Sequence, residues 1–174
     1  MKIILFLLFG CAIASPLSAE NSTTKPATPV APAKATPPMA VTEAVISAPL
    51  VFKDGAISQP AQTEVTEGGK AIFTFKVAEA GEYLIHAVVN ASDEDSNSFF
   101  LNIDGQPEDP LMIWDMEVTK GFEERIVSWR GSGDSASDEF SPKIFKLTAG
   151  EHKLIVVGRE PAQLKSLAIR RASK

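Results

Sequence analysis

The sequence predicts an all-β protein, a small antiparallel sandwich, over about residues 43–171. Apolar and polar residues alternate in 71–77 and 99–104, which is the period of a strand with one buried face. Residues 83–89 are apolar at nearly every position and indicate a strand buried on both faces. Turns with glycine separate these segments, and none has a helical period with caps. Many short strands without helices predict a sandwich or a barrel.

Further strands are expected near the C-terminus, over 144–147, 153–157 and 163–170. Two turns share one pattern, Ala80-Gly81-Glu82 and Ala149-Gly150-Glu151, each between similar apolar segments. We interpret this as the same turn used twice, because no third copy indicates a repeat architecture.

Residues 1–19 are expected to be a signal peptide. Lys2 precedes an apolar run, Ile3 to Ile13, that is too short to span a bilayer as a helix, and Ala19 supplies the small residue at the cleavage site. This predicts a secreted or periplasmic protein whose mature chain has no transmembrane segment. The alternative is lipid anchoring through Cys11, because Leu8-Phe9-Gly10-Cys11 resembles a bacterial lipobox. Cleavage after Ala19 would leave no cysteine, and so no disulfide or thiol chemistry.

Residues 20–42 are rich in proline, alanine and threonine and are expected to form a disordered, extended linker. The remaining residues, 43–171, are enough for one domain with its own core.

Composition and motifs argue against nucleic-acid binding and catalysis. The formal net charge is −5 and the pI about 5.1, so the chain lacks the basic field of a nucleic-acid-binding protein. His86 and His152 are far apart, and no nucleophile elbow, phosphate loop or zinc motif occurs. Acidic clusters at 93–95 and around Asp134 and Asp138-Glu139 are interpreted as solvated loops. The alternatives are a calcium site or a small hydrolase.

The two tryptophans, Trp114 and Trp129, lie where the strand pattern is interrupted. A tryptophan at a sandwich rim can stack on the apolar face of a sugar, while polar neighbours bond its hydroxyls. The alternative is that both fill the core. The polar candidates for such a ligand site are Asn97, Asp115, Arg130, Arg159 and Glu160.

The chain resembles the galactose-binding-domain-like sandwiches, above all carbohydrate-binding modules of the family 6 and family 35 type. The resemblance is carried by Asn97-Ser98-Phe99-Phe100 with Ile103-Asp104-Gly105, by both tryptophans, by Leu147-Thr148-Ala149-Gly150-Glu151-His152 and by Gly158-Arg159-Glu160. It implies a non-catalytic jelly-roll sandwich, of a kind often appended to secreted glycan-degrading enzymes. The ligand would be a polysaccharide or other glycan, held by loops at one end or on a concave sheet face.

The resemblance also has departures. The family often has an Asn that binds sugar and an Asp that binds calcium in the last loop and strand. In this sequence the Asn is missing, and Lys165 occupies the position of the Asp. Glu43 matches a position that can serve calcium, which makes it a candidate ligand, and Lys165 could instead form an ion pair with Glu43. No other cofactor is expected. The leading hypothesis is an exported carbohydrate-binding module, and the alternative is a structural or protein-interaction module of the cell envelope.

Overall fold

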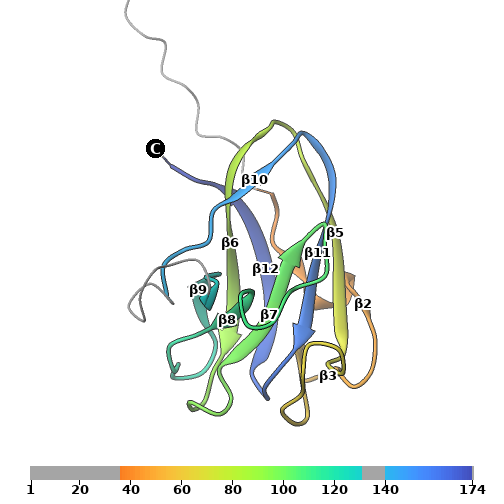
Figure 1. The fold of residues 1–174 in the computed structure, drawn as a ribbon, viewed down its shortest axis with the longest axis vertical. Helices are drawn as coiled ribbons and strands as arrows, with labels where there is room; N and C mark the ends of the chain where they lie inside the picture. Colours follow the sequence, from red (N-terminus) through yellow and green to blue (C-terminus); the bar gives the residue numbers. More distant parts are fainter. Residues whose placement is uncertain (1–35, 131–139, 174) are drawn as a thin grey trace, which may run out of the picture. The chain divides into compact units, whose positions relative to one another are not determined.

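The computed structural model describes residues 36–130 and 140–173 (Figure 1). Within these ranges the chain forms β-strands, one short 3₁₀ helix, η1 (Val41–Glu43), and no α-helix, which confirms the predicted all-β class. The strands are β1 (Met39–Ala40), β2 (Val45–Ile46), β3 (Val51–Lys53), β4 (Ala56–Ser58), β5 (Lys70–Val77), β6 (Gly81–Asn90), β7 (Ser98–Ile103), β8 (Ile113–Asp115), β9 (Glu123–Ile126), β10 (Phe145–Leu147), β11 (Gly150–Gly158) and β12 (Gln163–Arg171).

The strands form two antiparallel sheets. The seven-stranded sheet has the order β10-β6-β12-β4-β3, with β9 also on β6 and β1 also on β12, and the five-stranded sheet has the order β2-β5-β11-β7-β8. The chain changes sheet between β5 and β6, between β6 and β7, and again on each side of β11. Neighbours in a sheet are therefore mostly distant in sequence, as in a jelly-roll sandwich.

Alternation along the strands places the core between the sheets. In β5 the side chains of Ala71, Phe73, Phe75 and Val77 are buried, as the sequence predicted. In β6, however, only alternate residues from Tyr83 to Val89 are buried, and those between them are half-buried. The expectation of a strand buried on both faces is wrong here, because the side chains on the outer face of the seven-stranded sheet are only partly covered.

The fold begins before the expected boundary at residue 43. The backbone N–H of Thr36 donates to the carbonyl of Ile169 at 3.2 Å, and the N–H of Ile169 donates to Oγ1 of Thr36 at 3.1 Å. Met39 and Ala40 then pair with Leu167 and Ser166 in β12. Residues 36–42 are thus part of the sandwich rather than of a linker. The predicted signal peptide, Cys11 and residues 20–35 lie outside the described residues, and no described helix is long and apolar enough to cross a membrane.

The two turns of similar sequence lie next to each other, since Leu147 pairs with Gly81 and Gly150 pairs with Val77. Both connect one sheet to the other, but their backbones differ. Gly150 has a φ of 137°, whereas Gly81 is not among the glycines with positive φ. The two segments with the shared sequence pattern therefore both connect the two sheets, but their turns have different backbone conformations.

Close packing of glycines brings the β11–β12 connection against the β4–β5 connection. A Cβ on Gly158 would lie 2.3 Å from Oε1 of Gln59, whose side chain is buried and also accepts a hydrogen bond from the N–H of Gly69. Only glycine fits at this distance, so Gly158 fixes where Arg159 and Glu160 emerge from the sheet.

Candidate functional site

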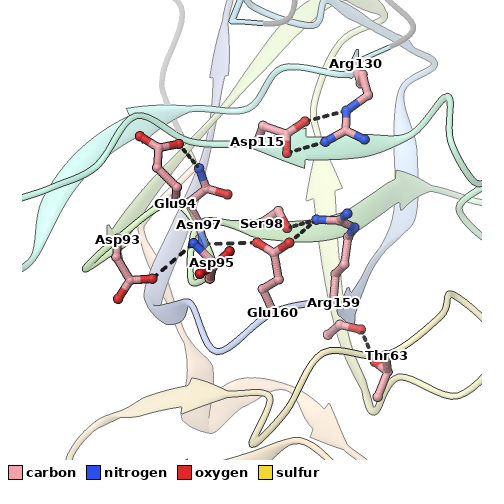
Figure 2. A network of polar contacts seen from close by, with 11 residues as sticks. Thr63, Asp93, Glu94, Asp95, Asn97, Ser98, Asp115, Arg130, Arg159 and Glu160 are labelled. Carbon is pink, nitrogen blue, oxygen red and sulfur yellow. Dashed lines mark hydrogen bonds and ion pairs between the residues drawn. The ribbon is translucent and has the colours of Figure 1, made fainter.

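The five polar candidates from the sequence meet at one end of the five-stranded sheet (Figure 2). Asn97 directly precedes β7, Asp115 is the last residue of β8, and Arg159 and Glu160 follow β11. They come together because Ser98 pairs with Asp115 and Phe99 pairs with Gly158. The sheet register therefore gathers residues that are up to 63 positions apart in the sequence.

Glu160 is the centre of this network. Its carboxylate accepts a hydrogen bond from the backbone N–H of Asn97 at 3.2 Å and forms an ion pair with Arg159. Nη1 of Arg159 also donates to Oγ of Ser98 at 2.6 Å, and Nδ2 of Asn97 donates to Glu94 at 3.4 Å. These bonds join the loop before β7 to the connection between β11 and β12.

Asp115 and Arg130 form a second pair beside it. Nε and Nη2 of Arg130 donate to the two carboxylate oxygens of Asp115 at 2.9 and 2.8 Å. Two parallel bonds between a guanidinium and a carboxylate fix both orientation and distance. The pair thus holds the chain after β9 against the end of β8.

Burial shows which of these groups face solvent. Asn97, Asp115 and Glu160 are only 8%, 6% and 6% exposed, whereas Arg130 is exposed. Buried charges that are paired and hydrogen-bonded hold a structure together, and few of their atoms remain for a ligand. The network therefore acts first as a scaffold that positions the loops.

Trp114 is buried, at 1% exposure, and packs against Phe99 with ring centroids 6.3 Å apart. Of the two positions that the sequence left open for this residue, the structure has the core and not the rim, because its strand β8 pairs with β7 and directs the indole inward. It does not present a free ring face to a sugar.

Trp129 is half-buried and held on three sides. Its Nε1 donates to the carbonyl of Leu101 at 2.9 Å, and its ring makes an edge contact with Phe145 at 5.5 Å. The ammonium of Lys143 lies 4.1 Å from the ring centroid. A sugar that stacked on this face would have to displace a cation–π contact.

The residues present do not fit a calcium ion at Glu43. Oε1 of Glu43 accepts the N–H of Ala40 at 3.0 Å, which closes the turn of η1. Lys165 lies 5.3 Å from the ring centroid of Phe122 and not against Glu43, so the expected ion pair between them is wrong. Among the described residues no group of three or more potential ligands is placed to hold a metal ion.

The acidic loop at 93–95 bonds to itself. Asp93 accepts hydrogen bonds from Ser92 Oγ at 2.9 Å and from the N–H of Asp95 at 3.1 Å. The hydroxyls of Ser92 and then Ser96 lower the pKa of this exposed carboxyl. This fits a solvated loop. The second predicted acidic cluster, Asp134 with Asp138-Glu139, lies outside the described residues.

Both histidines have a carboxylate partner that the sequence did not reveal. Nδ1 of His86 lies 3.0 Å from Glu124, which also receives two hydrogen bonds from Arg170. Nδ1 of His152 lies 2.6 Å from Asp104. Each pair joins two strands, and neither is part of the polar network.

A cleft that the sequence analysis missed opens beside Asp115. Its volume is about 230 Å³, and it lies between the end of β8, strand β9 and residues 140–142. The polar side chains that line it are Asp115, Glu117, Arg125 and Ser128, and Phe140 and Pro142 form an apolar wall. Phe140 is 48% exposed, so its ring is accessible. The cleft joins an accessible aromatic ring to charged groups.

Arg125 is the cation in the lining of this cleft. Nη2 pairs with Glu123 at 2.8 Å, and Nη1 donates to the carbonyl of Glu124 at 3.1 Å. Nε is buried and has no partner among the described residues. A buried donor without a partner costs about 1–3 kcal/mol, and the burial of this nitrogen closes it off from a ligand in the cleft.

The two sheets and their strand order define an antiparallel jelly-roll β-sandwich. The chain is similar to a family 35 carbohydrate-binding module from Clostridium thermocellum, with 11% identity over 79% of this chain and 100% of that one and a TM-score of 0.55. It is also similar to the C-terminal family 6 module of a laminarinase from Zobellia galactanivorans, with 9% identity over 77% of this chain and 98% of that one and a TM-score of 0.51.

A family 6 module of a Cellvibrio mixtus lichenase, solved with cellotriose, matches with 11% identity over 80% of this chain and 100% of that one and a TM-score of 0.50. In an exo-β-1,3-galactanase from Phanerochaete chrysosporium the match covers only 29% of the enzyme chain. No family model and no curated protein matches the sequence. At these identities the likeness establishes the fold.

Proposed function

We propose that this protein is an exported carbohydrate-binding module without catalytic activity, and that the cleft beside Asp115 is where it contacts its glycan. The observation that carries this proposal is the cleft itself, which combines an exposed aromatic ring with carboxylates and a guanidinium on a sandwich shared with modules of families 6 and 35. The apolar run expected to direct export supports the same assignment.

The size of the cleft suits a short ligand. Pockets for drug-sized ligands are roughly 300–1,000 Å³, and this cleft, at about 230 Å³, is smaller. One sugar residue with part of its neighbour would fill it. Binding through so small a half-open surface is expected to be weak, and multivalent polysaccharides would compensate through avidity.

The chemistry of the lining matches a sugar. The C–H face of a pyranose can pack on Phe140, as apolar sugar faces pack on aromatic rings. Asp115 is 6% exposed and both of its oxygens bind Arg130, so it shapes the wall of the cleft and leaves the sugar hydroxyls to its neighbours. Glu117 supplies acceptors and Arg125 supplies donors. The bidentate pair between Asp115 and Arg130 holds the adjoining wall of the cleft in place.

The test is a pull-down and affinity electrophoresis with a broad panel of polysaccharides, followed by titration with oligosaccharides of any that bind. Phe140→Ala should lower affinity roughly five- to tenfold while leaving the unfolding midpoint almost unchanged, because the side chain is half exposed. Phe122→Ala is the matched control, since Phe122 is 41% exposed and does not line the cleft. Equal affinities of the two variants, or no binding to any glycan, would contradict the proposal.

Exposed apolar residues on an edge strand favour the second candidate, a protein-interaction module of the cell envelope. Val51 and Phe52 of β3 are exposed, and β3 is the last strand at its edge of the seven-stranded sheet. Open strand edges can pair with a partner chain. Co-purification of a protein that Phe52→Lys abolishes, and that no glycan displaces, would favour this candidate over carbohydrate binding.

A further inference from the structure

The charges around the cleft balance except at one residue. Asp115 is compensated by the two bonds from Arg130 at 2.9 and 2.8 Å, and Arg125 is compensated by Glu123 at 2.8 Å. Glu117 lines the same cleft and is exposed, and it has no ion pair within residues 36–130 and 140–173. No lysine lines the cleft, and the nearby ammonium of Lys143 lies over Trp129.

We propose that the cleft prefers a sugar that carries a protonated amine over one that carries a carboxylate, and that Glu117 sets this preference. The inference rests on the proposed function and names the class of sugar for the same site. A ring held against Phe140 brings its substituents within reach of Glu117. An ammonium there forms a charge-assisted hydrogen bond, whereas a uronate carboxylate meets a like charge and has only the already paired Arg125 as a counterion.

The size of the effect follows from the exposure of Glu117. An ion pair between exposed groups is worth about 0.2–1 kcal/mol, which corresponds to roughly a 1.4- to fivefold difference in affinity. The preference should weaken with added salt, because charges at the surface are screened. The neutral sugar should fall between the amine and the acid.

The experiment compares methyl glycosides of glucose, glucosamine and glucuronic acid, and the corresponding galactose series, by chemical-shift titration of the ¹⁵N-labelled protein at low salt and below the pKa of the sugar amine. The amino sugar should bind about 1.4- to fivefold more tightly than the neutral sugar, and the uronate more weakly. Glu117→Gln should bring the three affinities together, while Glu67→Gln, which removes an exposed charge outside the cleft, should leave the order unchanged.

Each result decides one of the two proposals. If the neutral and amino sugars bind equally, or the uronate binds best, the charge preference is overturned and carbohydrate binding stands. If the order persists in Glu117→Gln, Glu117 does not set the preference. If no saccharide in either series, and none in the polysaccharide panel, shifts a cleft resonance, both proposals fail.

Discussion

Nδ1 of His152 lies 2.6 Å from Oδ2 of Asp104, and the other ring nitrogen, Nε2, lies 2.9 Å from the carbonyl oxygen of Thr148. Both nitrogens face acceptors, so both bonds form only when the ring is a protonated imidazolium. Oδ1 of Asp104 also accepts the N–H of Lys153 at 2.9 Å. The contact therefore joins the end of β7 to β11 and to the turn between β10 and β11.

The pKa values of the two groups move in opposite directions. Burial opposes the charged form of His152, but the hydrogen bonds to Asp104 and to Thr148 outweigh it and raise the pKa. Burial likewise opposes ionisation of Asp104, but the bonds from His152 and Lys153 outweigh it and lower the pKa.

The sign of the pH dependence follows from these shifts. The contribution of His152 to stability is complete below about pH 6.5 and is lost as the pH rises through its raised pKa. The contribution of Asp104 is complete above about pH 3.9 and is lost as the pH falls through its lowered pKa. The pair should therefore stabilise the fold most between these limits.

His152→Gln is expected to lower the free energy of unfolding by about 1 kcal/mol at mildly acidic pH and by less at alkaline pH. The value is modest because half of the Asp104 side chain is exposed and screened. Urea denaturation across the pH range measures the difference, with His86→Gln as the histidine control. A loss that does not change with pH would show that His152 is neutral in the folded protein.

Glu160→Gln should destabilise the sandwich by about 3 kcal/mol. The substitution leaves the Arg159 side chain, which is only 17% exposed, without its carboxylate partner. Chemical denaturation of Glu160→Gln, of Arg159→Met and of the double variant forms a double-mutant cycle. Strictly additive effects would refute a buried ion pair that holds the β11–β12 connection.

Gly158→Ala should cost about 1–3 kcal/mol through overpacking, because the new Cβ would meet Oε1 of Gln59 at 2.3 Å. Gly105→Ala is the control, since there the nearest atom is the flexible amide of Asn102 at 3.1 Å. Thermal unfolding of both variants compares them. Equal midpoints would show that the β4–β5 connection moves away freely.

Fluorescence quenching by acrylamide should separate the two tryptophans. In Trp114→Phe the half-buried Trp129 is the remaining tryptophan, and in Trp129→Phe it is the buried Trp114. The first variant should therefore be quenched more strongly than the second. Adding Lys143→Ala to Trp114→Phe should increase quenching further, because the ammonium over the ring is removed. If Lys143→Ala has no effect on quenching, the cation–π contact does not cover the ring in solution.

The sequence predicts the strands better than it predicts the site. The alternation of apolar and polar residues from Ala71 to Val77 predicts directly which side chains are buried, because every second side chain faces the core. Trp114 could not be placed in this way. The residues around it, Met112, Ile113 and Met116, are apolar on both faces, so its burial is decided only by the pairing of β8 with β7.

The positions of polar residues near the expected strand ends were enough to predict the members of the network, but not that they form a buried scaffold. Asn97 and Glu160 lie 63 positions apart, and only the pairing of β7 with β11 shows that they touch and are buried. The sequence contains even less that would predict the cleft. Glu117 and Arg125 belong to a charged stretch without clear period, and Phe140 borders an acidic loop, so nothing local indicated that they share a surface.

The hydrogen bonds between Thr36 and Ile169 have a practical consequence for orientation. They hold the first described residue beside the C-terminal part of β12, whose end is marked at the top of Figure 1. The Glu160 network precedes the other end of this strand at Gln163, which lies six residues, or about 20 Å at the usual rise per residue, from Ile169. Attachment to a bead or a sensor surface through residue 36 should therefore leave the network end facing the solution, and attachment near Gln163 should obstruct it.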